Sequence, residues 1–301
     1  MPLSHVALAV LVVAIWGTNF VVIHAGLEYF PPLAFAAMRF ALASLPLLWL
    51  VPRPRMPAGT VIAYGMVVGV GQFGLMIYAM HGNISAGLAS LVIQTQAFFT
   101  IALALLIGGE RLRAGNVAAL ALCFAGIALI GLHMDGGADL IGIALVLLAA
   151  LGWAAGNILA KRAGHINMLA LMVWSSLAAV PPLLAAALLL EGPAAILAGI
   201  RHADAYAWAT LPWQSFANSL FGYSVWNWLL ARHRAADVAP IGLLVPLFGM
   251  GSAAWLLAEP MPGWKLAAAA LVLAGLGVNI WTARRAAGSL ADRQHEREGE
   301  A

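Results

Sequence analysis

The sequence predicts an all-α polytopic membrane protein, with ten transmembrane helices in a 5+5 inverted-repeat arrangement around a central cavity. The first observation is composition: 63% of the 301 residues are hydrophobic and 9% are charged, whereas a soluble domain carries about 25% charged residues. The second is a series of ten apolar runs, each close to the length of a membrane-spanning helix. The third is that the second half of the chain repeats the pattern of the first.

The ten runs are separated by short stretches that contain Gly, Pro or charged residues. A spanning helix needs about 20 mostly apolar residues, and the runs meet this length. The sequence therefore predicts spans over residues 4–24, 32–51, 58–80, 84–107, 114–133, 137–160, 168–190, 205–231, 236–258 and 263–283.

The Lys and Arg residues between the spans predict the orientation. If the N-terminus is cytoplasmic, twelve of them fall on the cytoplasmic side and two, Arg201 and Lys265, fall outside. Cytoplasmic loops carry an excess of Lys and Arg. We therefore expect a multi-pass protein of the cell inner membrane with both termini in the cytoplasm.

The opening stretch WGTNFVVIHAG has an echo 137 to 138 residues later. Trp16 and Asn19 correspond to Trp153 and Asn157, and Gly26 corresponds to Gly164. The predicted repeats are residues 1–134 and 135–285, followed by a disordered cytoplasmic tail over 286–301. Because five spans are an odd number, the second repeat enters the membrane in the opposite sense. Inverted repeats are typical of transporters, whose substrate site lies near the midplane between the halves.

An Asn inside an apolar run such as the one around Asn19 needs partners. Trp16 and Asn19 are three residues apart and share a helix face, and Trp153 and Asn157, four apart, do the same. We expect these faces to line the substrate cavity. The alternative is that the Asn side chains hydrogen-bond neighbouring helices and the Trp side chains only pack.

Further candidate substrate-binding residues come from three other spans: Tyr78, His81, Gln94, Phe98, Phe99, Gln214 and Asn218. Tyr78 and His81 are also compatible with interfacial positions. Gln94 and Phe98 share one face, and Gln96 and Phe99 lie roughly opposite, so we expect only one of the two Gln residues to face the cavity; the sequence does not say which.

Arg39 is the one basic residue well inside a predicted span, about 10 Å from its start. It could attract a substrate carboxylate, or it could pair with Glu28 or with helix-end carbonyls. Pro46, Pro240 and Pro246 also fall within spans, where they allow either a hinge or a static kink.

Four stretches together resemble the drug/metabolite transporter superfamily, and in particular its ten-helix EamA-type members: WGTNFVVIHAG, PPLAFAAMRF, ASLVIQTQAFFT and the GERL turn. The resemblance covers nearly the whole chain. It implies a 5+5 inverted-repeat fold with a central cavity, and export of small metabolites, commonly amino acids and their derivatives.

The resulting interpretation is a carrier that exports small neutral or zwitterionic metabolites, amino acids first, by alternating access. The alternative is a proton-coupled exporter of drugs or lipophilic cations, but no Asp or Glu lies in the middle of a predicted span. An enzyme would need clustered His, Asp or Glu, and the eight His residues are scattered. We expect no metal, cofactor or nucleic-acid partner; the expected partners are the small-molecule substrate and the lipid bilayer, with the protein a monomer or a weak homodimer.

Overall fold

The computed structural model of the chain describes residues 1–108, 114–133, 137–162, 167–233 and 235–299. The helices of the first half are α1 (Leu3–Leu27), α2 (Pro32–Ser44), η1 (Leu45–Leu47), α3 (Ala58–Tyr64), η2 (Gly65–Gly74), α4 (Leu75–Met80), α5 (Ala86–Val92), η3 (Ile93–Thr95), α6 (Gln96–Gly108) and α7 (Ala114–Leu132). Those of the second half are α8 (Leu140–Arg162), α9 (Met168–Leu190), α10 (Pro193–His202), α11 (Ala205–Pro212), η4 (Trp213–Phe221), α12 (Gly222–Arg232), α13 (Ala235–Val238), η5 (Ala239–Leu244), α14 (Val245–Leu256) and α15 (Gly263–Gly299).

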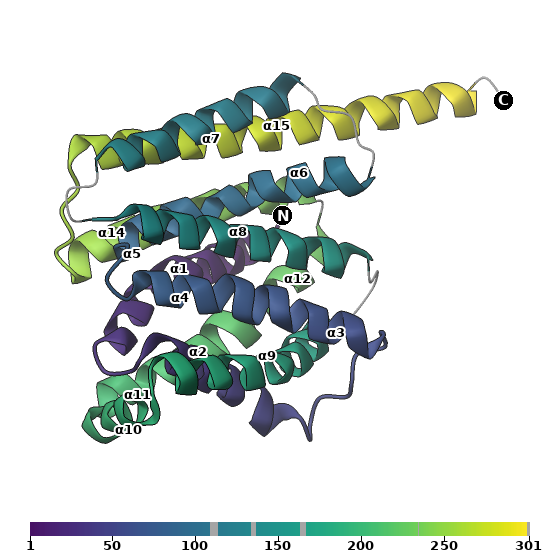
Figure 1. Cartoon of the computed structure of the whole chain (residues 1–301). Helices are drawn as coiled ribbons and strands as arrows, with labels where there is room; N and C mark the ends of the chain where they lie inside the picture. The colour runs from purple at the N-terminus through teal and green to yellow at the C-terminus, as the bar shows by residue number, and fades with distance from the viewer. Residues whose placement is uncertain (109–113, 134–136, 163–166, 234, 300–301) are drawn as a thin grey trace.

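Apart from the short helix α10, these elements join end to end into ten helical segments in the described part of the chain (Figure 1). Seven stretches are long and apolar enough to cross a membrane, and two shorter apolar ones, Pro32–Leu47 and Pro240–Leu256, accompany them. The remaining segment, Ala205–Arg232, is helical throughout but contains more polar residues. The predicted all-helical, polytopic fold is confirmed.

The helices pack in pairs that respect an inverted repeat. α2 lies along α9, and α7 lies along α15, so the second segment meets the seventh and the fifth meets the tenth. α1 packs on α14 and α6 packs on α8, which pairs the first segment with the ninth and the sixth with the fourth. If each segment is replaced by its counterpart in the other half, the α2/α9 and α7/α15 contacts stay the same, and the α1/α14 and α6/α8 contacts replace one another. This is the symmetry expected of a repeat. In Figure 1 the α7/α15 pair and the α2/α9 pair lie at opposite edges of the bundle.

The two halves also share their helical irregularities. The third and eighth segments each widen into a π-helical stretch, η2 and η4, whereas the fourth and ninth each tighten into a 3₁₀ stretch, η3 and η5. In η4 the Ser219 hydroxyl donates to the Gln214 carbonyl five residues earlier, at 2.9 Å. Single π turns within helices occur frequently at functional sites.

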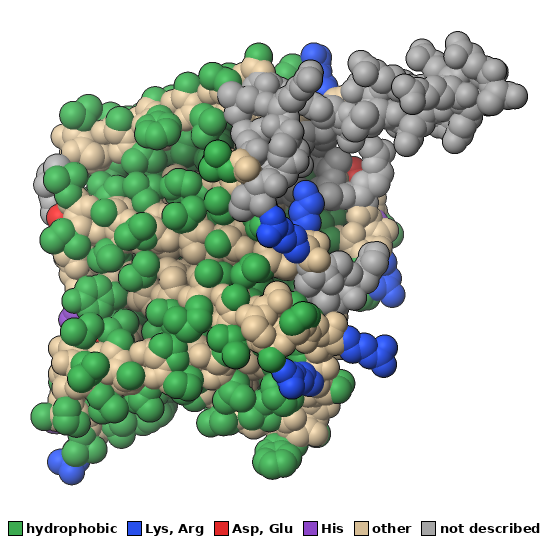
Figure 2. Space-filling model, turned by 45° about the vertical axis from the view of Figure 1, so that its right-hand side comes forward, with side chains coloured by type: hydrophobic (Ala, Val, Ile, Leu, Met, Phe, Trp, Pro, Cys, Tyr) green, Lys and Arg blue, Asp and Glu red, His purple; other side chains and the backbone are tan. Residues whose placement is uncertain are grey.

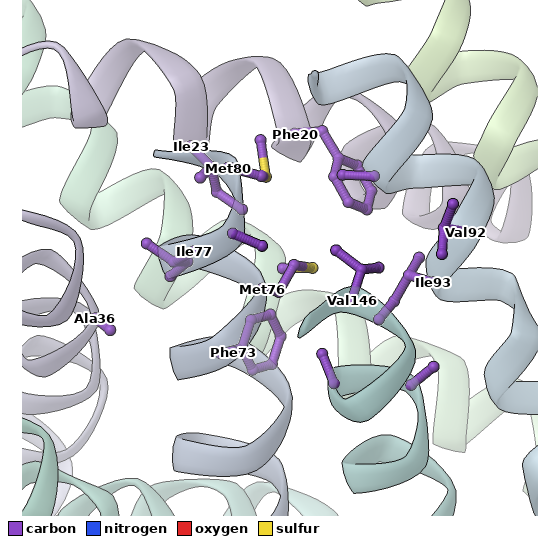
Figure 3. Packing of buried hydrophobic residues seen from close by; sticks show 14 of the residues in the cluster. Phe20, Ile23, Ala36, Phe73, Met76, Ile77, Met80, Val92, Ile93 and Val146 are labelled. Carbon is purple, nitrogen blue, oxygen red and sulfur yellow. The ribbon is translucent and has the colours of Figure 1, made fainter. Parts of the chain in front are cut away.

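The apolar core lies where α1, α5, α8 and the third segment meet. Phe20, Ile23, Met76, Ile93 and Val146 converge there, and each is at most 5% exposed (Figure 3). This packing holds the inner faces of both halves in fixed positions around the space described below.

Charged residues separate into two ends of the bundle. We call the end with Arg53, Arg55, Lys161, Arg162 and Arg232 the basic end; Figure 2 shows Lys and Arg side chains gathered on it. The opposite, acidic end carries Glu28, Glu191, Asp204 and Glu259, together with Arg201 and Lys265.

Two segments differ from the sequence prediction. The predicted loop around residues 193–202 is the helix α10, which begins with Pro193 directly after Gly192 at φ +83°. The tail predicted to be disordered from residue 286 continues α15 as a helix to Gly299. Its Ala, Arg, Glu and Gln residues are good helix formers, which a judgement based on polarity alone overlooks.

Candidate substrate cavity

A cavity of about 940 Å³ lies between the two halves. Its mouth is at the basic end, where Lys161, Asn167 and Ala231 are exposed and line it. Its walls are aromatic and amide side chains from both halves, namely Trp16, Tyr64, Gln94, Gln96, Trp153, Asn157, Tyr223, Trp226, Trp228, Asn227 and Asn279.

Trp16 is fixed in this wall by both faces of α1. On one side, Gly17 lets α1 approach α14, since a Cβ there would lie 2.7 Å from the Val245 carbonyl oxygen. On the other, the Trp16 indole Nε1 donates to the Asn218 carbonyl at 3.1 Å, and the ring lies 5.2 Å from that of Trp226. The Gly in this motif therefore permits the close approach that positions the neighbouring Trp.

Asn157 forms the corresponding part of the opposite wall. Its Nδ2 donates to Gln96 Oε1 and to Thr100 Oγ1, each at 3.4 Å. These contacts join α8 to α6 and leave the Asn157 side chain lining the cavity. Asn157 thus both hydrogen-bonds a neighbouring helix and lines the cavity, two positions that were alternatives on sequence grounds.

Both Gln94 and Gln96 line the cavity, so the expectation that only one of them does is wrong. The reason is the 3₁₀ stretch η3, which contains Gln94. In an α-helix residues two apart point about 160° from each other, whereas at three residues per turn the separation falls to about 120°.

A small void of about 40 Å³ lies next to the cavity and shares Trp16, Gln94, Trp153 and Tyr223 with it. Asn19 and Asn218 line this void rather than the main cavity. Asn19 is 3% exposed, and its Oδ1 has no hydrogen-bond partner among the described residues.

The other predicted site residues lie elsewhere. Gln214 is fully buried and lines neither space. Phe98 is buried with its ring directed at Gly275 of α15, and Phe99 packs at the edge of the core. Tyr78 and His81 line a separate depression of about 610 Å³ at the acidic end.

The placement of Tyr78 corrects the expectation that it borders the central cavity. That expectation extended an α-helical period along the whole third segment, but the π-helical stretch η2 precedes Tyr78. A wider turn changes the direction in which every later side chain points. Substrate binding by any of the eleven predicted residues stays a prediction.

Sequence reasoning missed several wall residues. Tyr64 and Asn279 stand alone in apolar surroundings, with no partner at helical spacing to draw attention to them. Tyr223, Trp226 and Asn227 belong to the segment Ala205–Arg232, which contains more polar residues than the other segments. This polarity is the sequence signal that points to them as wall residues.

The cavity wall carries little charge. No Asp or Glu is among its described lining residues, and Lys161 at the mouth is the only cation among them. Arg39 is fully buried behind the wall, where its Nη2 donates to Ser219 Oγ at 2.8 Å. The alternative pairing of Arg39 with Glu28 is wrong, because Arg39 forms no ion pair with a described carboxylate and Glu28 Oε1 instead lies 3.9 Å from His24 Nε2.

The acidic end is held together by the contacts of three carboxylates, Glu259, Glu191 and Asp139. Glu259 accepts from Ser85 Oγ at 2.6 Å and from the Gly87 backbone N–H at 3.0 Å, and it pairs with Lys265 Nζ at 2.8 Å. The Lys265 and Glu259 side chains are 4% and 9% exposed. This network ties the start of α5 to the connection between α14 and α15.

The other two carboxylates make similar contacts. Glu191 accepts from the first backbone N–H groups of α2, at 2.6 and 3.0 Å. Asp139 accepts from Asn83 Nδ2 at 2.8 Å and from the Gly142 N–H at 2.6 Å. These hydrogen bonds, the Gly142 bond first, lower the pKa of the Asp139 carboxyl. Carboxylates at helix N-termini are stabilised by the unpaired N–H groups there.

Comparison with known proteins gives the family. Residues 3–132 and residues 140–281 each match the EamA-like transporter family. The chain belongs to this family. The predicted resemblance is confirmed, and each match covers one half of this EamA-like transporter.

Proteins similar to this EamA-like transporter include bacterial proteins that are described as probable efflux pumps or exporters. It is 40% identical to a probable amino-acid metabolite efflux pump of Salmonella typhimurium (strain LT2), over 91% of this chain and 94% of that protein. A protein of the same description in Escherichia coli (strain K12) is 38% identical, over 92% and 95% of the two chains. A probable terminal-alkyne amino-acid exporter of Streptantibioticus cattleyicolor is 27% identical, over 92% and 93%.

A solved crystal structure has the same fold, with a TM-score of 0.63 and 18% sequence identity, over 94% of this chain and 98% of the other. Family and relatives point to a multi-pass membrane transporter of small molecules and not to an enzyme.

Proposed function

We propose that this transporter exports small neutral or zwitterionic metabolites, amino acids first, by alternating access, and that the structure represents its cytoplasm-open state. The observation that carries the proposal is the 940 Å³ cavity, which is open at the basic end, while carboxylate contacts join the helices at the opposite end. The two relatives near 40% identity, both described as probable amino-acid metabolite efflux pumps, support amino-acid metabolites as the substrate class.

The mouth of the cavity faces the cytoplasm in this proposal. Lys and Arg are enriched on the cytoplasmic side of membrane proteins, and the mouth lies among Lys161, Arg162 and Arg232. Both termini are then cytoplasmic, in the bacterial inner membrane. Tag-accessibility mapping tests this orientation: labelling of either terminus from outside intact cells contradicts it.

The chemistry of the wall suits amino acids. Trp and Tyr rings stack on apolar side chains, and amide groups hydrogen-bond both ammonium and carboxylate groups. A lipophilic-cation exporter needs a carboxylate in its cavity, and the described wall has none. A proton-coupled cation exporter is therefore the less favoured function.

Flux measurements in proteoliposomes test the proposal. Purified protein is reconstituted, and uptake and efflux are measured for a panel of radiolabelled L-amino acids and for tetraphenylphosphonium as a lipophilic cation. We expect flux of at least one amino acid above that of protein-free liposomes. Flux of the cation alone would replace the proposal by the cation-exporter function.

A matched pair of tryptophan variants tests whether the substrate passes through the cavity. Trp153→Ala removes a cavity wall residue, and we expect it to lower the amino-acid flux about tenfold, the effect of about 1.4 kcal/mol. Trp255→Ala removes a side chain that is 84% exposed on the surface and leaves the flux unchanged. Equal effects of the two substitutions would place transport outside the cavity.

Two structural expectations stay part of the proposal. The functional repeats are residues 1–134 and 135–285, and the protein is a monomer or a weak homodimer. Light scattering of the detergent-purified protein measures the second point.

A further inference from the structure

Arg39 is the largest fully buried side chain of the described chain. Its backbone is fixed, because the Arg39 carbonyl accepts from Ser215 Oγ of η4 at 2.7 Å. Its guanidinium lies 4.0 Å from the centroid of the Phe73 ring. Nη2 donates to Ser219 Oγ at 2.8 Å and, more weakly, to the Gln214 carbonyl at 3.4 Å. Arg39 thus sits between α2, η2 and η4.

The positive charge of this guanidinium is not balanced. Among the described residues Arg39 pairs with no carboxylate, and its Nε and Nη1 atoms have no hydrogen-bond partner. Three N–H bonds therefore have no hydrogen-bond acceptor among the described residues, although the guanidinium lies over the Phe73 ring. A buried charge that has no counter-charge, and only some of whose N–H groups are hydrogen-bonded, is unfavourable, so a bound anion would find a preformed donor there.

The neighbourhood of Arg39 contains more unpaired polar atoms. Gln214 Nε2 and Oε1, Gln72 Oε1 and Asn19 Oδ1 are buried and have no partner among the described residues. The set contains donors and acceptors, so it can hold a group that carries both charges. Gln72, Phe73 and Asn19 also line the 40 Å³ void, which shares wall residues with the main cavity.

The void is large enough for a carboxylate or a few waters. A water needs about 10–15 Å³ of such volume, and this void has about 40 Å³. Phe73 both lines the void and lies against the Arg39 guanidinium. Because Arg39 itself does not line the void, contact between its guanidinium and a group in the void requires this ring to move.

We propose that Arg39 binds the carboxylate of the transported molecule, and that the amide oxygens of Gln72 and Asn19 receive its ammonium group. This inference rests on the proposed function and narrows the substrate to molecules with a free carboxylate, such as amino-acid zwitterions. The molecule enters through the main cavity, passes Trp16 and Trp153, and places its carboxylate in the void. Occupancy supplies the missing counter-charge at the junction of α2, η2 and η4.

Transport of matched substrates tests the proposal. The amino acid with the highest flux in the wild type is compared with its carboxamide, which lacks the carboxylate charge. The variants are Arg39→Met, Arg39→Lys and, as a control for loss of an arginine, Arg53→Met, whose side chain is exposed in the loop before α3.

We expect Arg39→Met to lower kcat/KM for the amino acid by about 10- to 100-fold, the usual effect of losing a hydrogen bond to a charged group. The carboxamide should change by less than about twofold, Arg39→Lys should be intermediate, and Arg53→Met should match the wild type. An equal loss for both substrates assigns Arg39 a purely structural role and overturns the proposal, as does no loss for either.

A binding measurement keeps the test independent of flux. Thermal unfolding of the purified protein is followed in sodium acetate, in sodium formate and in sodium chloride of equal ionic strength. We expect the small carboxylates to raise the Tm of the wild type by about 2–4 °C over chloride and to leave that of Arg39→Met unchanged. If wild type and Arg39→Met respond equally, the site does not exist, whatever the protein transports. If the carboxylates act through Arg39 but no amino acid is carried, the proposed function fails and the site stands.

Discussion

Trp16 contributes both an aromatic face and one hydrogen bond to the cavity wall. Replacing it by Phe removes the donor to the Asn218 carbonyl and keeps most of the ring contact with Trp226. This hydrogen bond joins α1 to the buried Asn218 of η4, and losing it costs stability. We expect Trp16→Phe to destabilise the protein by about 0.5–1.5 kcal/mol, measured as a lower Tm in detergent. Trp226→Phe is the control, since no described residue accepts a hydrogen bond from its indole; equal losses would contradict the role of the hydrogen bond.

Two histidines, His5 and His233, predict a pH effect on stability. His5 Nδ1 and His233 Nε2 lie 2.6 Å apart, joining the start of α1 to the end of α12. Burial first, and then the charges of His5, the N-terminus and Arg232, lower the pKa of His233, against the opposing charge of Asp237. Between this lowered pKa and the ordinary value of about 6.5, the unfolded chain binds more protons than the folded one. The contribution of His233 to stability is therefore complete above about pH 6.5 and is lost as the pH falls through the lowered pKa.

Thermal unfolding between pH 8 and pH 5 measures this effect. We expect the Tm of the wild type to fall on acidification, and His233→Gln to show a smaller fall. His202→Gln serves as the control, because His202 is exposed and its hydrogen bond among the described residues stays within its own helix, to the Ala198 carbonyl. An identical pH dependence of all three proteins would refute the histidine contact as its source.

At the scale of elements, the contact of α1 with α14 depends on Gly17. A Cβ at this position would lie 2.7 Å from the Val245 carbonyl oxygen and 2.9 Å from the Gly249 nitrogen, and neither backbone can rotate away. Gly17→Ala should destabilise the protein by about 1–3 kcal/mol, as overpacking does. Gly277→Ala on α15 is the matched control, since its Cβ would meet nothing within 4 Å and should be neutral or slightly stabilising. A Tm of Gly17→Ala equal to that of the control contradicts this reading of the contact.

The sequence predicted the ten helical segments well, because hydrophobic length is a local property. It could not predict where a helix widens or tightens, which depends on partners such as the Ser219 to Gln214 contact within η4. Those irregularities determine which side chains line the cavity. Gln96 lines it together with Gln94, whereas Tyr78 lines a different depression.

The three prolines that the sequence placed within spans lie at or near helical irregularities. Pro46 and Pro240 lie in the 3₁₀ stretches η1 and η5, and Pro246 lies in the first turn of α14.

At the scale of the whole molecule, the absence of carboxylates from the described cavity wall predicts the energetics. A lone charge at mid-membrane costs several kcal/mol on insertion scales. A carrier that does not relay protons has no need of such a buried carboxylate. We expect substrate to move down its own gradient, or by exchange, without a bound proton. Amino-acid-loaded proteoliposomes should therefore release substrate after an ionophore has collapsed the pH gradient.

Two results would contradict uncoupled transport: flux that stops with the pH gradient despite a steep substrate gradient, or a stoichiometric pH change in the lumen. A histidine would then be the proton carrier to seek. His81 is the first to replace, although it lies in the depression at the acidic end and outside the cavity wall.

Four of the eleven tryptophans, Trp16, Trp153, Trp226 and Trp228, line the one cavity. Indole emission moves to shorter wavelengths when water leaves its surroundings, so a molecule that enters the cavity changes the light emitted by its own binding site. The transporter therefore carries a built-in optical reporter of occupancy, and a titration needs no label. Replacing Trp255, which is 84% exposed on the surface, removes background emission without altering the cavity wall.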